Sequence, residues 1–346
     1  MSLQLLPLEI LLQIFLLLGS AFFRQDARRL LVSKWWYQLA WPVLLQDLKF
    51  SDDSLLKFVL ASNKVDFVRS IQHHVRTVSL SLDGFEDWHS AQSGLGSMEI
   101  FGIEFYAVNT WITQLNGRLT ALASILQQCT RLQSLRLEAR PERHNPELGI
   151  QRRNYLKTLS LIRLVSISHL TCLEIDTAGT CLTGPINTSR RHPCDTISTM
   201  LSTLRRLRCR MSSICPRIFN AHAPGKGPFL SLEDVVINLS LSETSDSDTS
   251  YRYSSRCRCV PTDSFNQLKA DMESRARELV HIMKNPRIVR IVSHTYPDLE
   301  MRSFDALTGR RMVLASAVPW DADGEEVEEG ATAQDLFDSD SSSEES

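Results

Sequence analysis

Arginines are the residues of this sequence whose types and spacing most directly suggest a binding site. The run LRRLRCRM alternates Arg206, Arg208 and Arg210 with apolar residues. Residues two apart in a β-strand share one face, so this spacing places the three guanidinium groups together. The same alternation puts Arg136 and Arg290 on that face from neighbouring strands. Guanidinium groups pair with carboxylates and phosphates, so the pattern favours either a solvated basic face or a groove for an acidic or phosphorylated target.

Enzyme motifs are absent from the sequence. It contains no phosphate-binding G-x-x-x-x-G-K-[ST], no G-x-S-x-G and no H-E-x-x-H, so we expect a non-catalytic chain. An enzyme with an unrecognised motif is the alternative. Nucleic acid is a lesser option for the arginines, because no aromatic residues alternate with them to stack bases.

Cysteine and histidine offer two pairs of metal-binding type. Cys257 and Cys259 form C-x-C without a second Cys or His pair at zinc-finger spacing, so we expect no metal and no other cofactor. His73 and His74 are adjacent, and their side chains diverge, so we interpret them as surface residues. The eight cysteines lie at irregular spacings in a chain without an export signal, which favours reduced thiols in the cytoplasm or nucleus.

The N-terminal stretch is the element around which the rest of the chain is organised. In the run LPLEILLQIFLLL, which begins at Leu6, only Glu9 and Gln13 share a polar sector of a helix. A helix that is apolar on nearly all sides must be buried on more than one side. The surrounding unit spans only about 40 residues, a size that rarely buries such a surface alone. We therefore expect a partner to cover it.

Boundary signals predict three helices in this stretch. Pro7 suits a first helical turn, and Gly19 suits a helix end. Asp26 and Ser33 are suitable N-caps for a second and a third helix, which Pro42 would close. A secretory signal peptide is the weaker interpretation, because no Lys or Arg precedes the apolar run. A run of about 13 apolar residues is also short for a membrane span, which needs about 20.

The two halves of this stretch together resemble an F-box. The motif L-P-x-E-[IL]-L-x-x-I-F is followed by V-[CS]-K-x-W-x-x-L-A, and the continuation PVLLQDLKFS is similar to the form in filamentous-fungal F-box proteins. Ser33 replaces the commoner Cys, and Asp26 to Val32 is about one residue shorter than usual. The resemblance implies a three-helix unit that binds the Skp adaptor of cullin–RING ubiquitin ligases. It assigns adaptor binding to Leu6, Pro7, Ile10, Leu11, Ile14, Phe15, Leu18, Val32, Ser33 and Trp36. The side chains expected to be partly exposed until the adaptor covers them are Leu11, Ile14, Phe15 and Trp36.

A pattern L-x-x-L-x-L returns along the remainder of the chain, alternating with helix-like segments. Its first positions are Val75, Leu132, Leu170, Leu204, Leu232 and Ile288. The pattern predicts strands whose alternate residues, such as Leu135, Leu207, Cys209 and Ile237, are buried. The shortest distance in sequence between successive first positions fits a leucine-rich repeat that contains a helix. Each of the two longest distances leaves room for a degenerate repeat. An ordinary α/β domain is the alternative.

We therefore predict an α/β chain in three parts: an F-box at residues 1–50, an irregular leucine-rich-repeat-like solenoid at 51–320 and a disordered acidic tail at 321–346. A chain of 346 residues with 43% hydrophobic content can bury a sizeable core. The tail has no Lys or Arg, so the net charge of −2 combines an acidic tail with a basic body. Residues 291–314 are predicted as three strands that cap the solenoid.

The resemblance implies a function as the substrate-recognition subunit of a Skp–cullin–F-box ubiquitin ligase. Such a chain forms no bond itself and holds a protein target beside the enzyme that carries ubiquitin. Its expected partners are the Skp adaptor, and through it a cullin–RING ligase, and a protein target of acidic or phosphorylated character. No membrane is expected. The alternative is an interaction scaffold that binds the adaptor or other proteins outside any ligase.

Overall fold

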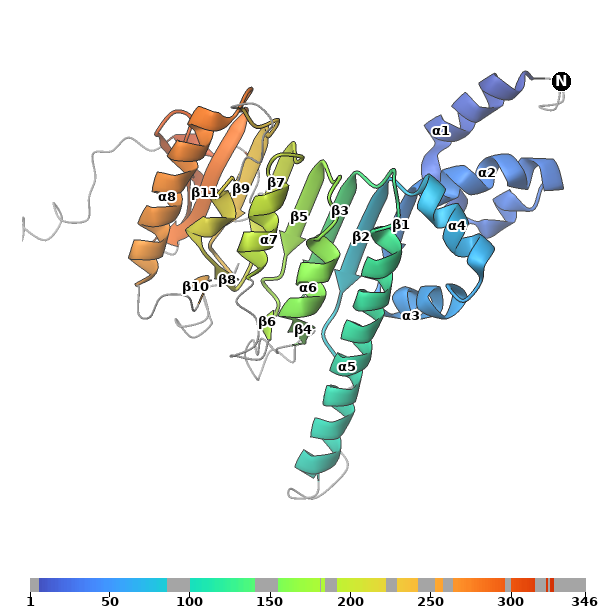
Figure 1. Cartoon of the computed structure of the whole chain (residues 1–346), viewed down its shortest axis with the longest axis horizontal. Coiled ribbons are helices and arrows are strands. Elements are labelled where there is room, and N and C mark those ends of the chain that lie inside the picture. The colour runs from blue at the N-terminus through green and yellow to red at the C-terminus, as the bar shows by residue number, and fades with distance from the viewer. Residues whose placement is uncertain are drawn as a thin grey trace, which may run out of the picture.

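A computed structural model provides the structure of the chain. It describes residues 6–85, 100–140, 155–180, 182–183, 192–221, 229–241, 253–257, 264–295, 300–314, 322 and 324–326. Figure 1 shows an elongated molecule in which one sheet runs along the length and a helical unit stands at the N-terminal end.

The N-terminal unit contains the three predicted helical segments, α1 (Leu8–Gln25), the 3₁₀ turn η2 (Ala27–Leu30) and α2 (Lys34–Gln46). Gly19 has a φ of +70° and interrupts α1, so the predicted helix end is a kink after which the helix resumes. Asp26 and Ser33 cap the next two segments through their side chains, as predicted.

Pro42 does not close the third helix, in contrast to the prediction. α2 continues past it to Gln46. A proline removes one helical hydrogen bond, and the burial of Ala40 and Val43 in the apolar cluster of the N-terminal unit offsets this loss.

The chain then enters the sheet through elements that the sequence largely predicts. The sequence here predicts a short strand over Asp47 to Phe50 and a capped helix over Asp52 to Ala61. Strand β1 (Asp47–Phe50) and helix α3 (Asp52–Ala61) have these bounds. Ser51 caps α3 in a reciprocal capping box with Ser54. Helix α4 (Val65–His74) follows and was not predicted.

Among the described residues the main sheet has ten strands, and their order is β1-β2-β3-β5-β7-β9-β11-β12-β13-β14. Strands β1 to β11 are parallel, and β12 to β14 are antiparallel. The bounds of the strands after β1 are β2 (Thr77–Leu82), β3 (Ser134–Ala139), β5 (Cys172–Asp176), β7 (Arg206–Arg210), β9 (Asp234–Asn238), β11 (Ile288–Thr295), β12 (Glu300–Asp305), β13 (Arg311–Leu314) and β14 (Glu325–Glu326).

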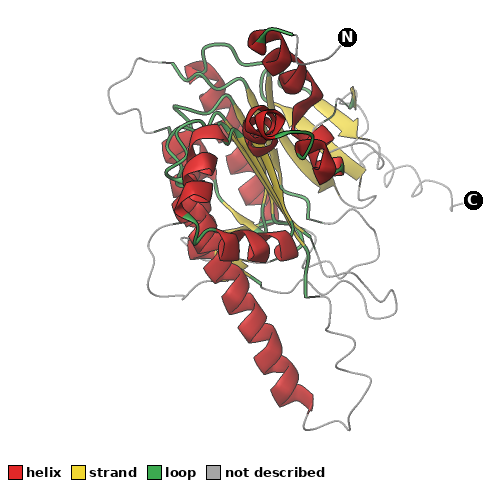
Figure 2. Cartoon of the chain, turned by 90° about the vertical axis from the view of Figure 1, so that its right-hand side faces the viewer, coloured by secondary structure: helices red, strands yellow, loops and turns green. Residues whose placement is uncertain are grey.

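Helices connect the parallel strands and pack on one face of the sheet. Figure 2 shows them gathered along one side of the strands, with the long helix α5 projecting beyond the rest. Their bounds are α5 (Ile100–Leu126), α6 (Thr158–Val165), α7 (Pro193–Met200), the 3₁₀ turn η4 (Pro216–Phe219) and α8 (Phe265–Ile282). Two short parallel pairs lie in the connections, β4 (Leu156–Lys157) with β6 (Leu182–Thr183), and β8 (Ser213–Ile214) with β10 (Ser255–Arg256).

The register of the parallel strands follows the repeated pattern in the sequence. Leu135 lies opposite Leu173, and Leu207 lies opposite Val235. β2 pairs directly with β3, and β9 pairs directly with β11, so no strand of a further repeat lies between the members of either pair. This outcome corrects the expectation that the two longest distances in the pattern leave room for degenerate repeats.

The predicted register of the last repeat is wrong by two residues. Ile291 is the second apolar position of its own repeat, yet it lies opposite Ile237, which is the third apolar position of the neighbouring repeat. Ile288 lies opposite Asp234 and packs with a cluster on the face away from the helices. The pattern at Ile288 therefore arises from apolar residues that belong to two faces of one strand.

The main core lies between the sheet and its helices. Leu135, Leu207, Cys209 and Ile237 are buried as predicted. They pack with helix residues in one cluster, among them Leu119, Leu122, Leu161, Ile197 and Leu279. Each fully buried apolar side chain of this size contributes about 1.5–3 kcal/mol.

The C-terminal strands form the predicted closing segment, and they also cover the second face of the sheet. Leu314 on β13 packs with Val236 and Val292 on that face. The predicted disordered tail begins too early, because β14 pairs with β13 inside it. Gly324 permits this approach, since a Cβ there would overlap the Val313 carbonyl. The remainder of the tail lies outside the described residues.

Candidate functional site

The N-terminal unit has a small aromatic core of its own. Phe15 makes edge-on contacts with Trp36 and Phe23, at ring-centroid distances of 4.5 and 5.7 Å. The indole N–H of Trp36 donates a hydrogen bond of 2.6 Å to the Arg29 carbonyl. The buried members of the cluster are Phe15, Phe23, Leu30, Ala40 and Val43. This core holds α1, η2 and α2 in a fixed arrangement.

Two of the residues assigned to adaptor binding belong to the interior of the chain. Leu11 is 1% exposed and Phe15 is fully buried, so the expectation that both are partly exposed is wrong. The kink at Gly19 folds α1 back so that Phe15 and Phe23 share one cluster. A unit this small has few side chains from which to build a core, and Phe15 is one of those that it buries.

A stripe of exposed apolar residues lies beside this buried line on α1. Ile10, Ile14 and Leu17 follow the spacing i, i+4, i+7, which places them on one side of a helix. Ile10 is exposed, Ile14 is half-buried and Leu17 is 88% exposed. We call these three residues the α1 stripe. Leu17 was not assigned to adaptor binding from the sequence, although its helical spacing from Ile10 and Ile14 marks it.

The remaining assigned residues lie around the same unit. Leu6, Leu18 and Val32 are exposed apolar side chains, and Trp36 is half-buried. Pro7 is exposed, and the Ser33 hydroxyl accepts a hydrogen bond from the Trp36 N–H, so that oxygen caps α2. Leu31 is 75% exposed and was also missed. Most of the large apolar side chains exposed in the described chain lie between residues 6 and 37.

Helix α1 is also long and apolar enough, by length and composition, to cross a membrane. Gly19 breaks it at a positive φ, so the segment from Leu8 to Leu18 covers roughly 16 Å at 1.5 Å per residue. The hydrocarbon core of a bilayer is about 30 Å thick. The apolar character of α1 therefore has to be explained by something other than a straight span.

The arginines of the predicted basic face do lie together. In the strand register, Arg136 on β3 and Arg208 on β7 each lie opposite Glu174 on β5, the strand between them. Arg206 and Arg210 lie on β7 on either side of Arg208. All four alternate with the buried core positions, so they occupy the face away from the helices. The predicted grouping is confirmed.

Carboxylates from neighbouring strands share this face. Arg136 is 3.4 Å from Glu174, Arg206 is 3.0 Å from Asp234, and Arg210 is 2.6 Å from Asp176. Neither a solvated basic face nor a groove for an acidic target took account of these internal partners, because the position of the carboxylates depends on strand register. The face is a ladder of ion pairs, which corrects the expectation of a basic groove.

Arg290 is not available to a target. It is 8% exposed, and its Nη1 donates a hydrogen bond of 2.8 Å to the Ala322 carbonyl. The closing strands cover the face at this end of the sheet, so the assignment of Arg290 to target binding is wrong. The side of β11 on which Arg290 lies was predicted correctly, whereas its contact with Ala322 was not.

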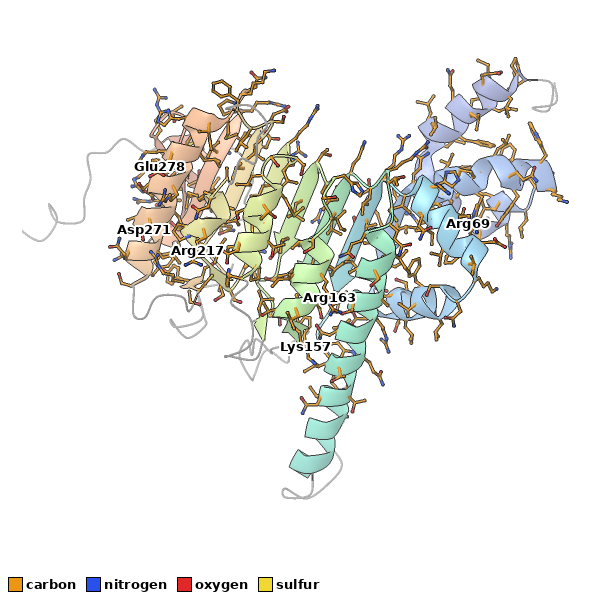
Figure 3. All side chains as sticks on the ribbon, in the orientation of Figure 1. Arg69, Lys157, Arg163, Arg217, Asp271 and Glu278 are labelled. Atoms are coloured by element: carbon orange, nitrogen blue, oxygen red, sulfur yellow. The ribbon has the colours of Figure 1, made fainter. Side chains whose placement is uncertain are left out.

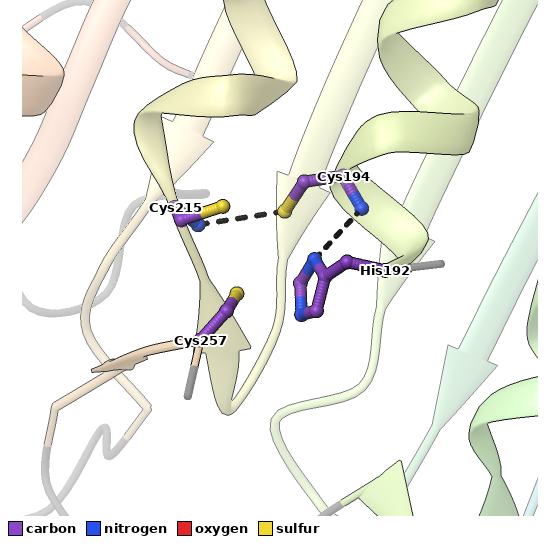
Figure 4. A group of neighbouring side chains, drawn as sticks. All are labelled: His192, Cys194, Cys215 and Cys257. Atoms are coloured by element: carbon purple, nitrogen blue, oxygen red, sulfur yellow. Dashed lines mark hydrogen bonds between the residues drawn. The ribbon is translucent and has the colours of Figure 1, made fainter. Parts of the chain in front are cut away.

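One group of metal-binding side chains was missed. His192, Cys194, Cys215 and Cys257 converge so that one ligand atom of each lies within 4.8 Å of the others (Figure 4). Cys259, the predicted neighbour of Cys257, lies outside the described residues. The only local signal is the H-x-C spacing of His192 and Cys194, because the other two members come from distant segments.

Comparisons with known proteins add no family to this description. A search with models of known protein families finds no match, and a search of curated proteins likewise finds none. The function is therefore inferred from the residues and geometry described above.

Proposed function

We propose that this chain is the substrate-recognition subunit of a Skp–cullin–F-box ubiquitin ligase. In this proposal the N-terminal unit is an F-box that binds the Skp adaptor. The strand–helix repeats form a leucine-rich-repeat-like region that holds a protein target. The chain is not an enzyme, and its contribution is to bring the target close to the ubiquitin-carrying enzyme.

The observation that carries the proposal is the exposure of the α1 stripe on a unit that already has a core. Phe15 and Phe23 pack in one cluster with residues of α2, so α1 is folded against α2. Leu17 is therefore exposed on a folded helix. Complete burial of side chains of this size contributes about 1.5–3 kcal/mol each. A partner that covers the α1 stripe therefore gains enough to bind specifically, and the resemblance of Ile10 and Ile14 to F-box positions supports the adaptor as that partner.

The repeat region supports the second half of the proposal. Its parallel strands follow one another in sequence order, and their connecting helices lie on one face. No described helix covers the other face of β1, β2, β3, β5 and β7, which we propose as the target face. That face presents Arg136, Glu138 and Glu174 in alternating charge. We therefore propose a target with mixed charge rather than a strongly acidic one.

The experiment is capture of the purified adaptor by the full-length chain. Leu17→Asp places a charge in the proposed contact, and burying an unpaired charge costs several kcal/mol, so capture should be lost. Leu60→Asp is the matched control, because Leu60 on α3 is 63% exposed and lies outside the N-terminal unit. Equal capture by the two variants would contradict the proposal.

A second measurement distinguishes the proposed ligase subunit from a scaffold that binds the adaptor outside any ligase. In the ligase proposal, proteins that co-purify with the chain gain ubiquitin when the chain is supplied to a reconstituted cullin–RING complex. The Leu17→Asp variant should retain these proteins and fail to promote their modification. Retained targets with no chain-dependent ubiquitin transfer would favour the scaffold.

A further inference from the structure

A buried cluster of three thiols and one imidazole lies at the helical side of the sheet, far from the N-terminal unit. Cys194 is fully buried, and Cys215 and Cys257 are 4% and 1% exposed. His192 is half-buried. The six cysteines in the described part of the chain form no disulfide.

Three separate segments bring these side chains together. His192 and Cys194 flank the start of α7, where the imidazole Nδ1 accepts a hydrogen bond of 3.1 Å from the Cys194 N–H. Cys215 follows β8 and precedes η4, and Cys257 follows β10. Since β8 and β10 are paired, the backbone fixes the last two cysteines side by side. Figure 4 shows all four side chains pointing into one space.

We propose that His192, Cys194, Cys215 and Cys257 form a tetrahedral structural zinc site. Three thiolates and one imidazole are a ligand set found in closed zinc sites, which have no open position for substrate. With Zn–S bonds of about 2.3 Å, sulfur atoms in a tetrahedral site lie about 3.8 Å apart. The observed spread of up to 4.8 Å means that small side-chain movements complete the geometry. They include release of the hydrogen bond from the Cys194 N–H to the His192 Nδ1, because a neutral imidazole has only one nitrogen lone pair to give.

The surroundings fit a bound metal better than they fit three ordinary core cysteines. The Cys215 N–H points at the Cys194 sulfur at 3.4 Å, the kind of outer hydrogen bond that supports a metal-bound thiolate. A cavity of about 230 Å³ reaches Cys215 and Cys257 from outside and gives an entry path. The capping hydrogen bond at the start of α7 holds the His192 ring at the edge of the cluster, where it faces the three sulfurs.

Three arginines lie beside the cluster, and each forms an ion pair, with Asp195, Asp271 or Glu278. On binding, the three thiols release their protons to solvent, so a Zn²⁺ ion with three thiolates and a neutral imidazole has one net negative charge. Arg217, Arg256 and Arg275 line the adjoining cavity. Figure 3 places Arg217 at the same end of the molecule as Asp271 on α8, the ion-pair partner of Arg256.

The consequence of this site is a cross-link within the C-terminal half of the sheet. It joins the start of α7 to the β8–η4 junction and to β10, and β8 and β10 pair with each other over two residues. The zinc ion would stabilise the repeats that carry the target face without any contact with a target. This inference is independent of the proposed adaptor binding.

The test is metal binding by the purified full-length chain under reducing conditions. We expect one zinc ion per chain by mass spectrometry of the metal content. The metal-free chain should bind Co²⁺ with the intense visible bands of a tetrahedral cobalt thiolate, and Zn²⁺ should displace it. Absence of these bands in the wild-type chain, a disulfide within the cluster or an iron–sulfur cluster would overturn the proposal.

Matched variants identify the ligands. His192→Ala should weaken Co²⁺ binding by at least about tenfold, since even outer-shell changes at metal sites cost 10–100-fold. His192→Cys supplies a fourth thiolate and should retain tetrahedral binding. Cys129→Ser removes a buried thiol outside the cluster and should bind the metal like the wild type. Equal binding by His192→Ala and Cys129→Ser would also overturn the proposal.

Discussion

Substitution of Arg210 tests whether the arginine face is part of the fold. Its Nε donates to Asp176 Oδ1 at 2.9 Å, and its Nη2 donates to Oδ2 at 2.6 Å. The two side chains are only 11% and 17% exposed. Arg136 makes a longer contact with Glu174, at 3.4 Å, and is 53% exposed. The two arginines therefore share a face and differ in burial.

Arg210→Gln removes one partner of a largely buried pair, a change that costs about 3–5 kcal/mol. Asp176 keeps its hydrogen bond from the Ala178 N–H, so we expect the low end, about 3 kcal/mol. Arg136→Gln breaks an exposed pair and should cost less than about 1 kcal/mol. At about 2–4 °C per kcal/mol, the Arg210 variant should lose at least 6 °C in Tm.

Urea and thermal unfolding of the full-length chain measure both losses. In a double-mutant cycle with Asp176→Asn, the combined variant should lose less stability than the sum of the single variants, because both remove the same contact. If Arg210→Gln and Arg136→Gln lower the free energy of unfolding by equal amounts, the buried ion-pair account is wrong.

Three further predictions concern other parts of the molecule. The buried Tyr155 hydroxyl donates to the Arg140 carbonyl at 2.7 Å, so Tyr155→Phe should lower the free energy of unfolding by about 1–2 kcal/mol in urea; no loss would mean that the bond is not formed. Gly19 has φ +70° and ψ 174°, so Gly19→Ala should destabilise the N-terminal unit by about 1–3 kcal/mol, visible as a lower Tm; an unchanged Tm would argue against the kink. A hydrogen bond from Arg256 lowers the pKa of Asp271. The ionised Asp271 carboxylate should therefore stabilise the fold fully above its unfolded-state pKa of about 4, and this stabilisation should disappear as the pH falls through the lower folded-state pKa. Unfolding of wild type and Asp271→Asn should therefore converge in acid, and a stability difference that persists there would contradict this assignment.

Local patterns predicted the strands well because each depends on neighbouring residues. The alternation at Leu135 and Leu207 requires only that one face be buried, and the structure buries both. β1 and α3 were predicted with correct bounds for the same reason, since Ser51 and the residues after it contain the cap. The register of β11 was mispredicted because both of its faces are apolar near Ile288.

The candidate sites were harder to predict because they depend on contacts between distant segments. Asp176 meets Arg210 only through the register of β5 and β7, and Arg290 is buried by residues near the C-terminus. The cysteine and histidine cluster joins positions as far apart as His192 and Cys257. No spacing rule within the sequence connects these residues.

In the N-terminal unit, residues that match a motif do not all have the exposure that the motif led us to expect. Phe15 matches the F-box pattern, and the structure places it in the core. The partition between Phe15 inside and Leu17 outside follows from the kink at Gly19 and the packing of α1 on α2. A motif gives residue types, whereas the core decides which of them remain exposed.

Calorimetric titration of the purified Skp adaptor into the full-length chain tests the central claim most directly. The proposal predicts saturable binding with equal amounts of the two proteins. Leu17→Asp should weaken it at least tenfold, which corresponds to about 1.4 kcal/mol or more, while Leu60→Asp binds like the wild type. Absence of binding by the folded wild-type chain, or equal affinities for the two variants, would contradict the claim that the α1 stripe contacts the adaptor.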